Sequence, residues 1–310
     1  MARGRFAPTP SGDLHLGNLR TALVAWLFAR GSGSEFVLRV EDLDPDTTTT
    51  GFAVRQLQQL RAIGIDWDGE VVHQSQRRPR HQAALAELER RDLVYPCYCT
   101  RREIRQAVRA PHSRPGYPGT CRNLDTAARR RLESEGRRPA LRLRSTGLEI
   151  RFEDELAGSV GAPVDDVVVR RNDGIVAYNL AVVVDDADQG VEMVVRGDDL
   201  IAATPAQIVL AGALAITPPR YAHVPLALGP GGARLAKRDG AVTLSDLAAG
   251  GYDPAAVRAL LAWSLGLSER GEPVTMDDLI DRFDPAAIPR DPWTVEADIL
   301  APSEPTASDG

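Results

Sequence analysis

The hydrophobic and polar positions of the first 80 residues change period from strand-like to helix-like and back. A short apolar stretch near residue 5 enters a turn rich in proline and glycine, and apolar residues then recur at helical spacing from Leu16 to Leu27. This pattern predicts a strand followed by a helix that begins at about His15. It also predicts a second strand over 35–40 and a second helix over about 51–63.

Strand signals return in the middle of the chain. Valine-rich segments predict three further strands, at 167–169, 182–184 and 193–195. Thr204 and Pro205 are typical of an N-cap followed by the first helical position, so a helix is expected to begin there. Residues 242–290 are expected to form short helices, and the polar end at 301–310 is expected to be disordered.

This order of elements predicts an α/β nucleotide-binding fold that is split by an insertion. Its ligand crevice should lie at the carboxyl ends of the strands. The expected divisions are 1–80 and 166–241 for the two halves of the catalytic domain, 81–165 for the insertion, 242–298 for a helical connecting segment and 299–310 for the tail.

Composition narrows the class of protein. The 310 residues are 43% hydrophobic, enough for a substantial core, and no apolar run approaches the roughly 20 residues of a membrane span. No signal-peptide pattern follows Met1, so a cytoplasmic location is expected.

The net charge of −6 argues against a dedicated nucleic-acid binder, although a local basic face can act independently of net charge. Arginines cluster at three places: Arg77, Arg78 and Arg80; Arg101, Arg102, Arg105 and Arg109; and Arg129, Arg130 and Arg131 with Arg137 and Arg138. The run at 129–131 is equally consistent with a solvated helix face that it shares with Glu133 and Glu135.

Lys237 is the only lysine among the 37 basic residues of the chain. It lies in a glycine-rich stretch at 229–240. A lysine ammonium is a compact, mobile charge that can follow a phosphate as its geometry changes, whereas a guanidinium is a rigid plane. Lys237 is therefore a candidate phosphate ligand, although one lysine could also survive a compositional preference for arginine by chance.

The turn before the first helix is a second candidate phosphate site. A helix N-terminus offers unpaired N–H groups and the positive end of the helix dipole. Gly17 leaves room for a ligand against the backbone, and His15 can donate a hydrogen bond to a phosphate oxygen. A His-x-Gly motif taken alone has another explanation besides phosphate binding, namely a histidine that caps the helix or packs against it.

The three cysteines fall within one short window, as Cys97, Cys99 and Cys121. An odd, clustered set argues against a disulfide framework and favours a metal. Zinc takes four ligands, so the three sulfur atoms leave one position, for which His112 and Tyr117 are the nearby candidates. The alternative is a set of buried cysteines without metal. A single structural zinc ion would stabilise a small module that lacks a core of its own.

These motifs together resemble the class I aminoacyl-tRNA synthetases. His-Leu-Gly-Asn at 15–18 occupies the place of their first signature, His-Ile-Gly-His, and Arg-Leu-Ala-Lys-Arg at 234–238 resembles their second, Lys-Met-Ser-Lys-Ser. Segments similar to the glutamyl and glutaminyl branch follow in family order, at 5–12, 40–44, 178–181, 184–186 and 196–200. The sequence departs from the family at Asn18 and in the second signature, which lacks both serines and the first lysine.

The resemblance implies a Rossmann-like class I catalytic domain split by a zinc-containing, tRNA-contacting insertion. It implies ATP binding with Mg²⁺, and it assigns the ATP-binding residues as His15, Gly17, Asn18 and Lys237, of which His15 and Lys237 are catalytic. It assigns glutamate binding to Arg5, Phe6, Ala7, Pro8, Thr9, Glu41, Tyr178 and Arg196. It implies the zinc ligand set Cys97, Cys99, Tyr117 and Cys121, with Tyr117 rather than His112 as the fourth ligand.

About 70 residues follow Lys237, too few for the anticodon-binding region of an ordinary glutamyl-tRNA synthetase. The chain in this respect resembles the truncated glutamyl-Q tRNA(Asp) synthetase family. This resemblance implies activation of L-glutamate with ATP and its transfer to queuosine, the wobble base of tRNA(Asp), by a monomer that grips the anticodon arm. Two alternatives remain open: charging of a tRNA 3′ end or another acceptor, and an inactive paralogue that only binds nucleotide or RNA.

Overall fold

A seven-stranded sheet organises the part of the chain that carries the signature motifs. The structure is a computed structural model that describes residues 3–46, 48–108, 116–145, 147, 149–229, 231–232, 235, 242–295 and 299. The strand order is β3-β2-β1-β9-β10-β6-β7, and every pair is parallel except β6 with β7. The strands are β1 (Arg3–Phe6), β2 (Glu35–Val40), β3 (Val72–His73), β6 (Glu149–Asp154), β7 (Gly158–Pro163), β9 (Met193–Gly197) and β10 (Arg220–Val224).

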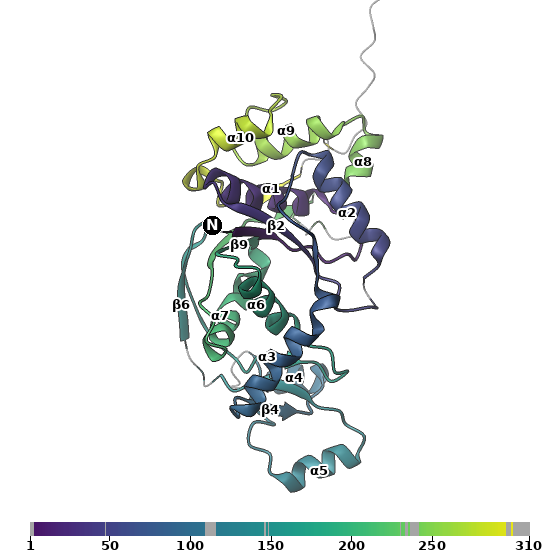
Figure 1. Ribbon diagram of the computed structural model, residues 1–310, viewed down its shortest axis with the longest axis vertical. Helices are drawn as coiled ribbons and strands as arrows, with labels where there is room; N and C mark the ends of the chain where they lie inside the picture. Colours follow the sequence, from purple (N-terminus) through teal and green to yellow (C-terminus); the bar gives the residue numbers. More distant parts are fainter. Residues whose placement is uncertain are drawn as a thin grey trace, which may run out of the picture.

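Helix α1 (Leu16–Gly31) packs on this sheet against β1 and β9. Ten of its residues are buried, which makes it the centre of the main hydrophobic core. The other side of that core comes from the C-terminal helices α8 (Leu244–Ala249), α9 (Pro254–Ser264) and α10 (Met276–Arg282), with α2 (Thr50–Ala62) beside them (Figure 1). The predicted first two strands and helices are therefore confirmed, and the described part of 242–290 contains the short helices α8, α9 and α10.

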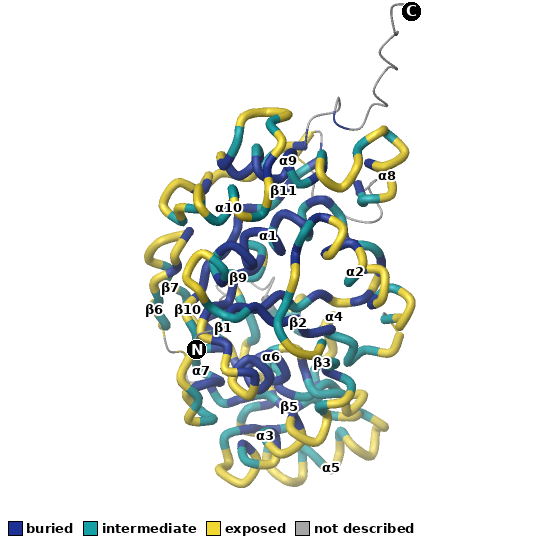
Figure 2. Tube along the Cα trace, turned by 45° about the horizontal axis from the view of Figure 1, so that its top comes forward, coloured by how far each residue is buried: buried dark blue, intermediate teal, exposed yellow. Residues whose placement is uncertain are grey.

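A second, smaller core lies below the sheet in Figure 1. It joins α3 (Arg78–Arg90), α6 (Tyr178–Asp188) and α7 (Thr204–Ala213) to a three-stranded antiparallel sheet of β4 (Val94–Cys97), β5 (Ala140–Leu143) and β8 (Val168–Arg170). Helices α4 (Arg101–Val108) and α5 (Thr126–Ser134) complete this end, and α5 has no buried residue (Figure 2). The remaining elements are η1 (Gln74–Arg77), η2 (Asp198–Ala203), η3 (Pro285–Ala287) and the parallel pair β11 (Ala227–Leu228) and β12 (Trp293–Thr294).

Two of the predicted elements differ in the structure. The valine run at 182–184 belongs to helix α6, not to a strand. Every residue from Leu180 to Asp186 is buried, and an apolar run enclosed on all sides has the same sequence signature in a buried helix as in a strand. Thr204 is the first helical residue rather than the N-cap, which is Ala203, because the Thr204 hydroxyl binds a side chain from β9 instead of a helix N–H group.

The predicted insertion at 81–165 contributes to both sheets. Its strand β4 pairs with β5, and β5 pairs with β8, in the small sheet, whereas β6 and β7 extend the edge of the large one. The small sheet and helices α4 and α5 thus form a separate end of the molecule, and the β6–β7 hairpin belongs structurally with the nucleotide-binding fold (Figure 1).

Candidate active site

A cavity of about 620 Å³ lies at the carboxyl ends of strands β1, β2 and β9. This is the edge at which parallel α/β sheets bind ligands. Its walls contain all the described residues that were predicted to bind glutamate or ATP: Arg5, Phe6, Ala7, Pro8, Thr9, His15, Gly17, Asn18, Glu41, Tyr178 and Arg196. The fold therefore brings together side chains that are up to 191 positions apart, from Arg5 to Arg196. Lys237 lies outside the described residues.

His15 is the N-cap of helix α1, and its ring orientation is set by Asn18. The backbone N–H of Asn18 donates to His15 Nδ1 at 3.2 Å, and the His15 N–H donates to Asn18 Oδ1 at 3.3 Å. Because Nδ1 accepts a hydrogen bond, a neutral ring carries its proton on Nε2, where it can donate. Asn18 thus completes a reciprocal capping box, a role that the sequence analysis did not foresee.

Gly17 is packed tightly between His15 and β11. A Cβ atom at this position would lie 3.1 Å from His15 Nδ1 and Cε1 and 3.3 Å from Ala227 Cβ. Those separations are shorter than ordinary van der Waals contacts, so a side chain at position 17 would have to displace the imidazole ring. Glycine at this position therefore preserves the orientation of His15.

Arg5 belongs to a buried network of charges below the cavity. It donates to the carbonyl of Val195 at 2.9 Å and lies 3.4 Å from Asp186 Oδ1, which also accepts from Arg39 at 2.6 Å. Burial alone would raise the pKa of Asp186, but the Arg39 and Arg5 guanidinium groups outweigh it and lower that pKa. The carboxylate therefore stays ionised and fixes both arginines.

Glu41 follows strand β2 and forms a largely buried pair with Arg39, whose Nη2 lies 3.4 Å from Glu41 Oε1. Burial raises the pKa of Glu41, and the opposing effects of Arg39 and Arg5 do not fully cancel it. A buried carboxylate with a raised pKa is well suited to bind a ligand cation, because the cation replaces lost solvation.

Arg196, near the end of β9, is almost fully buried. Its Nε donates to His223 Nε2 at 3.1 Å, and its Nη2 donates to the Thr204 hydroxyl at 2.7 Å. Its Nη1 is buried and has no hydrogen-bond partner among the described residues. A buried guanidinium with one unpaired nitrogen beside a cavity is suited to receive a carboxylate oxygen.

Tyr178 lies between this cavity and a second one of about 980 Å³, and Thr9, Glu41 and Tyr178 line both. The tyrosine exposes 37% of its surface, into these concave spaces. Burial raises the pKa of its hydroxyl, so the group remains a hydrogen-bond donor at neutral pH.

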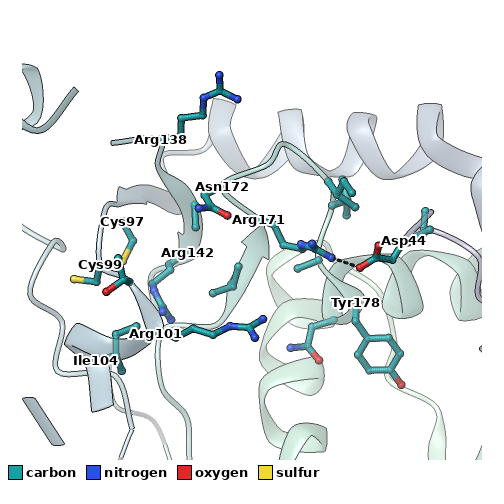
Figure 3. Close-up of a pocket in the computed structure, with 18 of the residues that line it drawn as sticks. Asp44, Cys97, Cys99, Arg101, Ile104, Arg138, Arg142, Arg171, Asn172 and Tyr178 are labelled. Atoms are coloured by element: carbon teal, nitrogen blue, oxygen red, sulfur yellow. Dashed lines mark hydrogen bonds and ion pairs between the residues drawn. The ribbon is translucent and has the colours of Figure 1, made fainter. Parts of the chain in front are cut away.

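The second cavity lies between the small sheet and the large one. Figure 3 shows Cys97 and Cys99 at one end, Tyr178 at the other, and Arg101 reaching between them. Five arginines line the cavity: Arg101, Arg137, Arg138, Arg142 and Arg171. Arg171 is paired with Asp44 at 2.6 Å, a bridge from the second half of the fold to the loop after β2. The lining is basic except near Glu41 and Asp44.

The cysteine cluster is compact. The three Sγ atoms lie within 4.8 Å of one another, and Cys99 Sγ is 3.5 Å from Cys121 Sγ. The Tyr117 hydroxyl lies 3.3 Å from Cys97 Sγ and accepts from the Cys121 N–H at 2.9 Å. A hydrogen bond from Cys99 lowers the pKa of Cys97. The predicted set is thus brought together, whereas His112 lies outside the described residues.

Described residues within and just after the second signature lie near the first signature. Leu235 lines the smaller cavity, and the carbonyl of Val242 accepts from the Leu16 N–H at 2.8 Å. Thr243 forms a β-bridge with His15. Leu235, Val242 and Thr243 therefore lie near the start of helix α1.

Comparison with known proteins agrees with this arrangement. The family described as tRNA synthetases class I (E and Q), catalytic domain, matches residues 1–302. The chain belongs to this family. Its predicted class I synthetase fold is confirmed.

Two curated relatives cover nearly the full chain, and both are called glutamyl-Q tRNA(Asp) synthetase. The protein from Nocardia farcinica is 58% identical over 97% of this chain and 96% of its own length. The protein from Symbiobacterium thermophilum is 47% identical over 97% of this chain and 98% of its own. The chain therefore also belongs to the glutamyl-Q branch of the class I family.

A solved structure gives the same fold. The crystal structure of a glutamate tRNA ligase from Elizabethkingia meningosepticum, in complex with its amino acid, superposes with a TM-score of 0.81 at 26% identity. The match covers 96% of this chain but only 68% of the Elizabethkingia chain. The two glutamyl-Q relatives, in contrast, match the present chain over nearly the full length of both partners. None of the described helices combines the length and apolar character required to cross a bilayer.

Several residues of this synthetase site were missed by the sequence analysis. Arg39, Asp154 and His223 make buried polar contacts around Arg5 and Arg196, yet they lie on strands and outside the cavity lining. The available signal was a charged or polar residue in an otherwise apolar strand, as in the segment Phe-Val-Leu-Arg-Val at 36–40.

Proposed function

We propose that this protein activates L-glutamate with ATP to glutamyl-adenylate and transfers the glutamate to queuosine at the wobble position of tRNA(Asp). The names and near full-length similarity of its glutamyl-Q relatives support this function. The single structural observation that carries it is the cavity in which two buried arginines meet one glutamate whose side chain is only 10% exposed. Glutamate has two carboxylates and one ammonium, so it requires that combination of charges.

The glutamate end of the cavity is proposed to bind the substrate by charge complementarity. Arg5 and Arg196 would bind its carboxylates, and Glu41 would accept its ammonium. Tyr178 would donate a hydrogen bond. The backbone of residues 6–9, which forms the adjoining wall, would position the substrate.

The other end of the cavity is proposed to bind ATP. The N-terminus of α1, with Gly17 and Asn18, would face the phosphates, and His15 would donate from Nε2 to the oxygen atoms on which charge develops. Lys237 would act on the same phosphates, a role supported by the positions of Leu235 and Val242, which lie on either side of Lys237 in the chain. Mg²⁺ would arrive with ATP, since it is held mainly by phosphates and water, and would neutralise phosphate charge.

Activation then needs positioning rather than a protein nucleophile. The α-carboxylate of glutamate attacks the α-phosphorus, the bond to the bridging oxygen breaks, and pyrophosphate leaves. In the second step a hydroxyl of the queuosine cyclopentenediol attacks the acyl carbon. The ester forms, AMP leaves with the bonding electrons, and the hydroxyl proton is released.

The basic cavity is proposed to receive the anticodon loop. It shares Tyr178, Glu41 and Thr9 with the glutamate cavity, so a base held there would present its diol to the adenylate. Arg101 and Arg138 form no ion pair with any described residue, so both are available to phosphates.

One structural zinc ion is proposed for the cysteine cluster. Zn–S bonds of about 2.3 Å place tetrahedral sulfur atoms about 3.8 Å apart, close to the 3.5 Å between Cys99 and Cys121. The donor set therefore fits zinc, with Cys97 and Tyr117 as the other ligands. When bound, the ion would tie β4 to the loop around residue 121 and so stiffen the wall of the basic cavity.

The division of the chain is also a proposal: halves of the catalytic domain at 1–80 and 166–241, an insertion at 81–165, and a helical segment at 242–298 before a tail. We further propose a cytoplasmic monomer, because the substrate tRNA is cytoplasmic and one chain contains both cavities.

Transfer of labelled glutamate to tRNA(Asp), with and without queuosine, tests the function. Labelling only of the queuosine-containing tRNA is expected, and periodate treatment, which cleaves vicinal diols, should abolish it. Labelling of unmodified tRNA would instead establish charging of the 3′ end. Absence of both labelling and glutamate-dependent ATP–pyrophosphate exchange would leave a nucleotide- or RNA-binding paralogue.

The proposed role of the basic cavity has its own test. Arg101→Ala and Arg138→Ala should each weaken transfer to tRNA and reduce its salt dependence, since each removes one phosphate contact. Glutamate-dependent ATP–pyrophosphate exchange without tRNA should be unchanged. Arg151→Ala is the matched control, because that exposed arginine on β6 lies outside both cavities. Equal transfer by all three variants would refute the assignment.

A further inference from the structure

His223 links the glutamate cavity to a buried carboxylate that lines neither of the two cavities described above. It lies on β10 directly beside Arg196 on β9, in register in the parallel pair. Its Nε2 is 3.1 Å from Arg196 Nε, and its Nδ1 is 2.5 Å from Asp154 Oδ2 on β6. His223 and Asp154 are both buried, and neither lines the cavity. Three strands thus contribute one continuous chain of hydrogen bonds that ends at Arg196.

The direction of these hydrogen bonds follows from chemistry. Arg196 Nε always carries a proton, so His223 Nε2 must accept, and the ring proton of the neutral imidazole must be on Nδ1, where it donates to Asp154. Burial lowers the pKa of His223, with Asp154 opposing that effect, so the ring is neutral near pH 7. The arrangement therefore specifies one tautomer.

Asp154 itself cannot easily turn. Its Oδ1 accepts from the backbone N–H groups of Leu156, Ala157 and His223 at 3.0, 2.9 and 3.0 Å. Only Oδ2 faces the imidazole. The two oxygens thus have separate tasks: Oδ1 anchors the carboxylate to the backbone, and Oδ2 determines which ring nitrogen of His223 carries the proton.

The consequence appears at the guanidinium of Arg196. His223 occupies its Nε and Thr204 occupies its Nη2, at 3.1 and 2.7 Å, so the edge that joins these two nitrogens is held by protein. Nη1 is buried and without a partner among the described residues. The Nη1 end is therefore the part of the group that remains to bind a ligand.

We propose that Asp154 and His223 are positioning residues for glutamate: by fixing the histidine tautomer they hold Arg196 so that its Nη1 end meets a substrate carboxylate. This inference rests on the proposed binding of glutamate in the cavity. It assigns a function to the β6–β7 hairpin, which supplies Asp154 although it lies away from the cavity.

Asp154→Asn is the decisive variant. The amide oxygen should take the place of Oδ1, because three backbone donors require an acceptor there. The amide NH₂ must then face His223 Nδ1, which forces the ring proton onto Nε2, against the N–H of Arg196. Loss of one charge-assisted hydrogen bond should raise KM for glutamate roughly tenfold or more in ATP–pyrophosphate exchange without tRNA. KM for ATP should remain within about twofold, because Arg196 does not face the ATP end.

Asp166→Asn is the matched control. Asp166 is equally buried and accepts from Tyr95, Arg122 and the Ser145 N–H, but it does not line the glutamate cavity. The control should lower the melting temperature without changing KM for glutamate. A glutamate KM that rose equally in both variants would overturn the inference, because general damage to the fold would then explain it.

A second pair of variants does not depend on the aspartate. In His223→Gln the side-chain oxygen can accept from Arg196 Nε, whereas in His223→Leu nothing can. KM for glutamate should rise roughly tenfold or more in the leucine variant and recover most of the way in the glutamine variant. Equal KM values in the two variants would contradict a positioning role.

The tautomer of the His223 ring can be measured directly by NMR in the absence of substrate. Nitrogen-15 NMR of histidine-labelled protein should show His223 protonated at Nδ1 in the wild type and at Nε2 in Asp154→Asn. A switched tautomer with unchanged KM would overturn the inference but leave the proposed function intact. Absence of glutamate-dependent exchange in the wild type would instead refute the proposed function, and the NMR result would still stand.

Discussion

Replacing Gly17 by alanine should separate stability from catalysis. The new Cβ would lie 3.1 Å from His15 Nδ1 and Cε1 and 3.3 Å from Ala227 Cβ. Ala227 is on a buried strand next to α1, whereas the His15 ring lies at the cavity wall and accepts a hydrogen bond of 3.2 Å from the Asn18 N–H. The imidazole should therefore be the group that moves, by a few tenths of an ångström.

The two effects of this change have opposite signs. Alanine in a helix is favoured over glycine by up to about 1 kcal/mol, and crowding against His15 and Ala227 costs a similar amount. The melting temperature should therefore change by no more than about 2–4 °C. Displacement of His15 Nε2 from a phosphate oxygen should forfeit one charge-assisted hydrogen bond, about 1.5–3 kcal/mol, which corresponds to a roughly 10- to 150-fold decrease in kcat.

Glutamate-dependent ATP–pyrophosphate exchange at saturating substrate measures the loss, and thermal unfolding measures stability. Gly212→Ala is the matched control, because it makes the same change in helix α7, where a Cβ would meet no atom within 4 Å. The control should keep full activity and gain slightly in stability. Wild-type kcat for Gly17→Ala would refute the argument that this glycine protects the orientation of a catalytic His15.

Three further predictions concern charge and metal. As the pH falls toward the raised pKa of Glu41, protonation of its carboxylate should weaken binding of the substrate ammonium. KM for glutamate should therefore begin to rise at a pH higher than 4.5, the ordinary pKa of a glutamate side chain. Glu41→Gln should give a high KM that no longer depends on this titration. Chelation of zinc, or the substitution Cys99→Ser, should remove one equivalent of metal per chain and lower the melting temperature. Transfer of glutamate to tRNA should decrease, while ATP–pyrophosphate exchange without tRNA should persist. A metal-free wild-type protein with normal transfer would contradict this prediction. Asp185 is fully buried and accepts from Gln74, Arg77 and His81, so Asp185→Ala should destabilise the protein by about 3–5 kcal/mol, and unchanged unfolding would count against it.

The parts of the fold that sequence predicted well are those with one buried face or a terminal signal. The strand at 35–40 and the helix that begins after His15 were both placed correctly. The segment at 182–184 was misassigned because helix α6 is buried between α3, α7 and strand β8, so it has no polar face to reveal its period. The spacing of apolar residues predicts whether a segment is a helix or a strand only when one face of that segment is exposed to solvent.

The site was predictable to the extent that its residues carry the family motifs. Arg5, Glu41, Tyr178 and Arg196 were predicted in this way, and the structure brings them to one cavity. His223 and Asp154 could not be found by the same reasoning, because their chemistry depends on the register between β9 and β10 and on the attachment of β6 beyond them. A residue that acts through a neighbouring strand leaves no spacing in the sequence by which to recognise it.

The unpaired nitrogen of Arg196 connects stability to recognition. Leaving a buried donor unsatisfied costs about 1–3 kcal/mol in the free protein. The cost persists because His223 and Thr204 hold the other two nitrogens, so the guanidinium cannot rotate to pair Nη1 with another group without breaking a bond already made. In the proposed binding mode a substrate carboxylate would relieve this cost, whereas a neutral amide would offer one acceptor at most and could turn its own donors toward the arginine. On this proposal, selectivity for glutamate over its amide should depend on how firmly the protein holds Arg196 in the absence of substrate.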